Sequence, residues 1–137
     1  MKIQLFLIAV AILCGCRSSE FPIAASTIGD DTPMAENEGI GPKRIFAAPY
    51  GVVWDSALRM VKQKGLVIKS LNEANGFIEA ESAGKSGGEL VGIWLHETGE
   101  EATEVEVYFR VEGNNRELMK TQSETILNSI AQALGLP

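Results

Sequence analysis

The chain has 137 residues, which is enough for one ordinary domain, and 22% of them are charged and 45% hydrophobic. Its 12 basic and 18 acidic residues give a net charge of −6, which argues against a nucleic-acid-binding protein because phosphates need a basic surface. One histidine and two cysteines are too few for an ordinary zinc site, so we expect neither a metal nor a cofactor.

Residues 1–15 have the pattern of a lipoprotein signal peptide. A basic residue near the start precedes an 11-residue apolar stretch, which is too short to cross a membrane as a helix. The stretch ends in Leu13-Cys14-Gly15-Cys16, which resembles the bacterial lipobox. Cys16 fits the acylated position because the small residue Gly15 precedes it, whereas Cys14 follows a bulky leucine. We therefore expect cleavage between Gly15 and Cys16 and a lipid on Cys16.

The expected location follows from this signal. Bacterial lipoproteins of this type usually carry three acyl chains, which makes the attachment to the membrane effectively permanent. An aspartate after the cysteine would resemble an inner-membrane retention signal, whereas Arg17 follows it here. We therefore expect the protein in the bacterial cell envelope, at the outer membrane and facing the periplasm. The alternative is an ordinary signal peptide or anchor with incidental cysteines.

Residues 16–42 are expected to be the lipidated cysteine and a flexible linker. Ser, Thr, Gly, Pro, Asp, Asn and Glu dominate from residue 17, and the apolar residues are scattered without a helical or strand period. As a flexible coil, the 26 residues from 17 to 42 would span roughly 28 Å. The alternative is that residues 21–28 dock on a partner or on the domain itself. The folded periplasmic domain is expected over residues 43–137.

The domain pattern predicts seven elements in the order β-α-β-β-β-β-α. A short strand at 43–47 is followed by a helix that starts after Pro49, buries Trp54 and ends at Gly65. Four strands are expected at 66–71, 77–81, 90–96 and 103–111, and a long helix at 116–134. Strands joined by short turns form an antiparallel meander, and two amphipathic helices would cover one of its faces. The expected fold class is an α+β two-layer sandwich.

The strands at 90–96 and 103–111 suggest a candidate interaction face. In 103–111, Val105, Val107, Phe109 and Val111 are expected to face inward, and Glu104, Glu106, Tyr108 and Arg110 outward. The strand at 90–96 is apolar on both faces, and Trp94 lies on the face with Leu90 and Gly92. The candidate face therefore comprises Trp94, Tyr108, Glu104 and Glu106, with Phe46 as a further member. The alternative is that Trp94 packs in the core or the hairpin.

Three other patterns are interpreted as structural. Gly84-Lys85-Ser86 resembles the end of a phosphate-binding loop but lacks the earlier glycine and the following helix, so we expect a hairpin turn. His96 is expected at the surface, because a histidine at a strand end near a turn is usually a surface residue, and its neighbour Glu97 points to the opposite strand face and so cannot assist it in acid–base chemistry. Clustered glutamates could bind Ca²⁺ or form a glycosidase pair, but alternation with apolar residues is typical of half-solvated strands and favours contact with a basic partner. These glutamates are Glu79, Glu81, Glu104 and Glu106.

Residues 43–81 resemble a pattern in small bacterial envelope lipoproteins. The pattern runs through IFAAPYGVVWDSAL at 45–58, KGL at 64–66 and NGFIEA at 75–80. It is similar to the helix-grip-like domains of the BamC (NlpB) lipoproteins of the outer-membrane protein assembly machine, and to uncharacterised lipoprotein families of like size. The resemblance implies a helix-grip-like version of the sandwich. BamC proteins carry two such domains, whereas the region from 43 to 137 has room for one.

The function we expect is that of a non-enzymatic protein-interaction module in an envelope complex, with outer-membrane assembly as the role that the resemblance implies. Its partners would be the membrane, through the lipid on Cys16, and an envelope protein. The alternative is a carrier of an apolar small molecule or lipid, which a pocket lined by Leu90, Trp94 and Ile130 would favour and a filled core would exclude. An inhibitor of a hydrolase that uses the acidic loop at 97–101 is a further alternative. No nucleophile, base and orienting residue can be assembled, so we do not expect an enzyme.

Overall fold

The computed structural model describes residues 32–83, 88–113 and 115–136. The expected signal peptide with Gly15, the lipidation site Cys16, the stretch 21–28 and the turn at 84–86 lie outside these residues. A short 3-10 helix, η1 (Met34–Asn37), comes first. The elements that follow are β1 (Lys43–Phe46), α1 (Tyr50–Gln63), β2 (Leu66–Asn72), β3 (Phe77–Ser82), β4 (Leu90–Gly99), β5 (Ala102–Arg110) and α2 (Arg116–Ala133).

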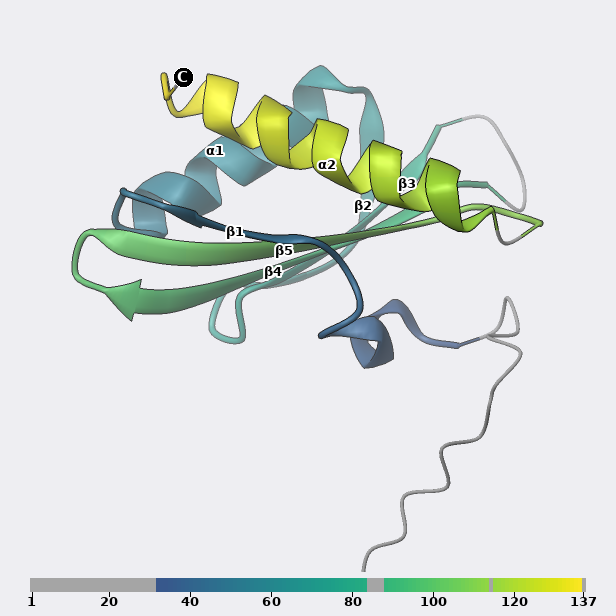
Figure 1. The fold of residues 1–137 in the computed structure, drawn as a ribbon, viewed down its shortest axis with the longest axis horizontal. Coiled ribbons are helices and arrows are strands. Elements are labelled where there is room, and N and C mark those ends of the chain that lie inside the picture. Colours follow the sequence, from purple (N-terminus) through teal and green to yellow (C-terminus); the bar gives the residue numbers. More distant parts are fainter. Residues whose placement is uncertain (1–31, 84–87, 114, 137) are drawn as a thin grey trace, which may run out of the picture.

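The strands form one antiparallel five-stranded sheet in the order β1-β5-β4-β3-β2. Both helices lie on the same face of this sheet (Figure 1). The predicted α+β two-layer sandwich and its order of elements are therefore confirmed. Within the part of the chain that the structure describes, neither helix has the length and apolarity that crossing a membrane requires.

The hydrophobic core lies between the helices and the sheet. The apolar stripe of α1, which includes Val53 and Trp54, is buried as its spacing predicts. In the sheet, Ile93 of β4 pairs with Val107 of β5, and both are fully buried on the helix side together with Ile130 of α2. Because these side chains meet in the middle of the two layers, apolar side chains fill the space between them.

Residues 33–42, which we call the strap, cover the other face of the sheet. Figure 1 shows the strap with η1 below the sheet, on the side away from α1 and α2. Met34 and Asn37 of the strap are almost completely buried. The Asn37 amide donates hydrogen bonds to the carbonyl oxygens of Pro33 (3.3 Å) and Met34 (3.4 Å). The expectation of a flexible linker up to residue 42 is therefore wrong for its last ten residues, which belong to the folded domain.

Candidate functional site

A carboxylate is buried beneath the strap. Glu106 lies in the middle of β5 and is 0% exposed. Its Oε1 accepts hydrogen bonds from the backbone N–H groups of Gly39 (2.7 Å) and Gly41 (2.9 Å). Its Oε2 lies 3.5 Å from Nζ of Lys43 and accepts no hydrogen bond within the described part of the chain. The expectation that Glu106 faces solvent is wrong, because the strap covers it and supplies N–H groups in place of water.

An indole ring lies beside this carboxylate. Trp94 of β4 pairs directly with Glu106 of β5, so the two side chains share the strap side of the sheet. The Trp94 ring packs against the Phe77 ring, with 5.3 Å between the ring centroids. Both Trp94 and Met34 lie against Gly92, where an added Cβ would collide with the indole and lie 2.8 Å from Met34 Cγ. Trp94 is 3% exposed, which agrees with the packing alternative rather than with an exposed anchor.

Tyr108 and Glu104 flank Glu106 along β5. Tyr108 is also buried, and burial raises the pKa of its phenol, an effect that nearby arginine charges partly offset. Glu104 stays partly exposed and lies 3.6 Å from Nζ of Lys43. The negative charges of Glu106 and then Glu104 raise the pKa of Lys43, because they favour its charged form.

The structure thus brings the residues of the candidate interaction face together, but underneath the strap. Trp94, Tyr108, Glu104 and Glu106 lie on the same side of the sheet. Phe46 does not join them, because it pairs with Thr103, whose position in β5 places both side chains on the helix side. That this face contacts a partner stays a prediction, since the strap occupies it here.

The strap residues that complete this site were not foreseen. Met34, Gly39 and Gly41 lie in a stretch whose composition is typical of a linker. The local signal is the sequence Gly-Ile-Gly-Pro at 39–42, in which Gly39 has a φ of +91°. Gly41 approaches β5 so closely that an added Cβ would collide with the carbonyl oxygen of Val107. A glycine pattern alone cannot distinguish this contact from a solvated turn.

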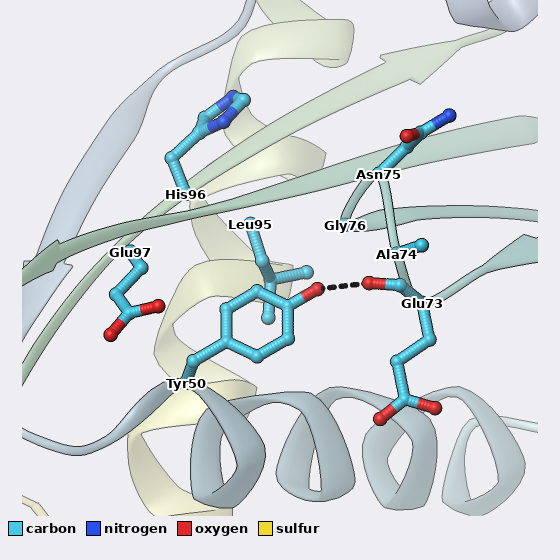
Figure 2. A pocket seen from close by; sticks show the side chains of 8 residues that line it. All are labelled: Tyr50, Glu73, Ala74, Asn75, Gly76, Leu95, His96 and Glu97. Carbon is cyan, nitrogen blue, oxygen red and sulfur yellow. Dashed lines mark hydrogen bonds between the residues drawn. The ribbon is translucent and has the colours of Figure 1, made fainter.

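An open hollow of about 340 Å³ lies at the end of the sheet near the start of α1. Figure 2 shows the ring of Tyr50 between Glu73 and Glu97. The Tyr50 hydroxyl donates a hydrogen bond to the carbonyl oxygen of Glu73 (2.7 Å), and burial, followed by the charge of Glu73, raises the pKa of Tyr50. His96 points to the other side of β4, where its Nε2 lies 2.8 Å from Oε1 of Glu38 (Figure 2 shows its direction). The hollow therefore contains no nucleophile held by a base.

Other sequence-based candidates do not form sites in the described residues. No group of three or more His, Cys, Asp or Glu side chains in residues 32–83, 88–113 and 115–136 could hold a metal ion. Glu79 and Glu81 of β3 are partly exposed, and Glu81 forms an ion pair with Lys69 (3.3 Å), as half-solvated positions do. The glutamates of the acidic loop at 97–101 are exposed around the hairpin between β4 and β5.

The pocket expected for a carrier of apolar molecules is not assembled. Trp94 faces the strap, whereas Ile130 lies in α2 on the opposite side of the sheet. Leu90 is partly buried on the strap side, since it lies an even number of residues from Trp94 in the same strand. The three side chains therefore cannot line one cavity.

Comparison with known proteins gives similarity in fold alone. No protein family and no curated protein matches the chain. An uncharacterised protein from Bacillus thuringiensis is similar in structure, with a TM-score of 0.48 and 10% identity over 68% of this chain and 93% of that chain. The di-domain aromatase/cyclase StfQ of the steffimycin biosynthetic pathway has a TM-score of 0.40 and 10% identity over 69% of this chain. The match covers 43% of the StfQ chain.

Proposed function

We propose that the protein is a lipid-anchored lipoprotein of the bacterial cell envelope whose folded domain is a non-enzymatic protein-interaction module. The lipobox-like sequence that ends at Cys16 supports the anchor. The absence of aspartate after Cys16 supports the outer membrane, with the domain facing the periplasm. The BamC-like pattern in residues 43–81 favours a complex concerned with outer-membrane assembly.

The observation that carries the interaction role is the sheet face beneath the strap. This face holds a stretch of peptide through one buried apolar side chain, Met34, and through two backbone N–H groups that donate to Glu106. Where a peptide adds as a strand to the edge of a sheet, hydrogen bonds to its main chain give affinity and pockets for alternate side chains give specificity. Here the same two kinds of contact are made on a sheet face, through the carboxylate of Glu106 and the site over Gly92. The domain therefore already contains the contacts that such a module needs.

A carrier of apolar molecules is less well supported. Such carriers need an enclosed apolar cavity of several hundred cubic ångströms. In this protein, Ile93 and Val107 of the sheet and Ile130 of α2 are fully buried between the sheet and the helices. The hollow beside Tyr50 is open and is flanked by two glutamates, which suits an apolar ligand poorly.

Cross-linking in intact cells tests the interaction role. A photo-reactive amino acid replaces Ile45, which is 62% exposed in β1 on the strap side of the sheet, and the matched control replaces Leu118, which is 41% exposed on α2. We expect an envelope protein to be cross-linked from position 45 and not from position 118. A co-purifying lipid in stoichiometric amount, with no cross-linked protein, would contradict the interaction role and support the carrier.

The anchor is tested separately by mass spectrometry and fractionation. The intact mass of the protein from membranes should show acylation of a chain that begins at Cys16. The Cys16→Ala protein should leave the membrane fraction, because a chain without acyl groups loses about 0.8 kcal/mol for every methylene it no longer buries. An unmodified Cys16 in the membrane fraction would contradict lipidation.

A further inference from the structure

The strap occupies its sheet face as a peptide ligand would. Its buried apolar side chain, Met34, fits over Gly92 and beside Trp94, whereas its other buried side chain, Asn37, donates to carbonyl oxygens of the strap itself. Its backbone donates from Gly39 and Gly41, two residues apart, to one oxygen of Glu106. These contacts involve the main chain, one unbranched apolar side chain and two glycines, of which Gly41 has no room for a Cβ against β5.

The strap leaves the buried carboxylate only half satisfied. Oε1 of Glu106 accepts two N–H groups, whereas Oε2 lies 3.5 Å from the ammonium of Lys43 and accepts no hydrogen bond from any residue that the structure describes. An ionised carboxylate can accept about four hydrogen bonds, and a buried one is stabilised by each that it gains. A peptide that donates to both oxygens of Glu106 would therefore satisfy this site better than the strap does.

From these contacts we infer that the face beneath the strap is the docking surface for an extended segment of a partner protein, and that this segment displaces the strap. The partner segment carries a methionine or another unbranched apolar side chain for the position over Gly92. Small residues follow it, so that the backbone comes close enough to β5 to donate N–H groups to both oxygens of Glu106. This inference deepens the proposed interaction role, on which it rests, but it does not depend on a lipid at Cys16.

The construction of the strap makes its displacement feasible. Toward its β1 end it is held through two glycines, Gly39 and Gly41, and glycine loses more conformational entropy on ordering than any other residue. Its side-chain contact between Glu38 and His96 (2.8 Å) lies at the surface with both side chains more than two-fifths exposed, where polar contacts contribute little. The helix-side core is formed by other elements, so it stays packed when the strap leaves.

Peptide binding in trans tests the inference on the full chain. The probe is a fluorescent synthetic peptide with the sequence of residues 32–42. In the Gly41→Ala protein the new Cβ would collide with the carbonyl oxygen of Val107, which forces the strap away from β5. Gly51→Ala is the matched control, because an added Cβ at this helical position meets no atom within 4 Å.

We expect the Gly41→Ala protein to bind the peptide at least about tenfold more tightly than the wild-type and Gly51→Ala proteins, in which the tethered strap competes at an effective concentration near millimolar. Adding Glu106→Gln to Gly41→Ala should weaken binding about tenfold, since it removes charge-assisted hydrogen bonds. A folded Gly41→Ala protein that does not bind the peptide would overturn the inference. If Gly41→Ala does not fold, Met34→Ala replaces it, because this change empties the site over Gly92 and leaves the backbone of β5 untouched.

The outcomes separate this inference from the proposed function. Peptide binding together with no cross-linked partner at position 45 would support displacement of the strap and contradict the role in an envelope complex. A cross-linked partner together with a folded Gly41→Ala protein that does not bind the peptide would support the role in an envelope complex and overturn displacement of the strap.

Discussion

Gly76 occupies a position where a side chain has no room. It lies in the turn between β2 and β3 with a φ of +66°, in the left-handed region that favours glycine. Its carbonyl oxygen accepts a hydrogen bond from the N–H of Leu95 (2.7 Å). An added Cβ would collide with the carbonyl oxygen of Leu95 and lie 3.2 Å from the hydroxyl of Tyr50. The close contact between this turn and strand β4 therefore requires a glycine at position 76.

We expect Gly76→Ala to lower the free energy of unfolding by about 2 kcal/mol or more, because it combines backbone strain with a steric clash. Urea unfolding at neutral pH measures the change. The matched control is Gly51→Ala, which has open space around the new Cβ and should be neutral or slightly stabilising. Equal stabilities of the two variants would contradict the close contact at Leu95.

The buried phenol of Tyr108 predicts a loss of stability at alkaline pH. Burial raises its pKa above the ordinary 10.0, so the folded state keeps the proton where the unfolded state has lost it. The titration of Tyr108 therefore does not change the free energy of unfolding below pH 10.0, and it lowers that free energy as the pH rises further toward the folded-state pKa. The raised pKa values of Tyr50 and Lys43 act in the same direction. In the Tyr108→Phe protein, the midpoint of urea unfolding should therefore fall less at alkaline pH than in the wild-type protein. An unchanged pH dependence of the midpoint would contradict a raised pKa of Tyr108.

The alternation of apolar and polar residues predicts the strand face of Glu106 but not its burial. The pattern in 103–111 correctly placed this residue on the side away from the helices, together with Tyr108. It could not predict burial, because a glutamate between apolar residues usually faces water. The N–H groups that replace water come from Gly39 and Gly41, 67 and 65 residues away in the chain. Such a contact follows from tertiary packing and has no local signal.

Helix α2 stabilises the edge of the sheet as well as covering its face. Strand β5 extends beyond its pairing with β1, and its N–H groups there need other acceptors. The N–H of Val107 donates to the carbonyl oxygen of Pro42 (3.1 Å), and that of Phe109 donates to the hydroxyl of Ser123 in α2 (3.0 Å). The Ser123 hydroxyl in turn donates to the carbonyl oxygen of Met119 (2.8 Å).

Ser123→Ala should lower the free energy of unfolding by about 1–3 kcal/mol, because it leaves the buried N–H of Phe109 without an acceptor. Ser129→Ala is the matched control. Ser129 makes the same type of bond to a helix carbonyl oxygen, that of Thr125, but at the surface, so its replacement should change stability by less than about 0.5 kcal/mol. Chemical denaturation of both variants measures the difference, and a neutral Ser123→Ala would show that Phe109 has another acceptor.

The strands and helices could largely be predicted, because their apolar periods are local. The helix stripe around Trp54 and the alternation around Val107 gave the right elements and the right buried faces. Phe46 was assigned to the wrong face because β1 is only four residues long, too short for alternation to show which side meets the helices. Its pairing with Thr103 decides the side, and that is a long-range contact.

The molecule has a third layer that the sandwich description leaves out. Helices cover one face of the sheet, and the strap covers part of the other face (Figure 1). Thr32, where the described chain begins, is held at the end of β5 by a hydrogen bond from Nη1 of Arg110 to its carbonyl oxygen (2.6 Å). The folded unit therefore includes at least ten residues before β1 that composition assigns to a linker.

A shortened chain that begins at Lys43 should be less stable than one that begins at Thr32. We expect a difference of at least about 2 kcal/mol in the free energy of unfolding, since burial of a methionine side chain alone contributes about 1.5–3 kcal/mol. The shortened chain should also bind a hydrophobic dye, because Trp94 and Tyr108 lose their cover. Urea titration and dye fluorescence measure both effects. Equal stability of the two chains would mean that the strap adds nothing to the folded unit.

If Cys16 carries a lipid, the position of the strap also sets the length of the chain segment that connects the membrane to the folded domain. Sixteen peptide steps separate Cys16 from Thr32, and 27 separate it from Lys43. At about 3.5 Å per step, the contour length is at most about 55 Å with the strap closed and about 95 Å with it open, whatever conformation the intervening residues adopt. A partner that takes the place of the strap would therefore lengthen this connecting segment by about 40 Å and let the domain move farther from the bilayer.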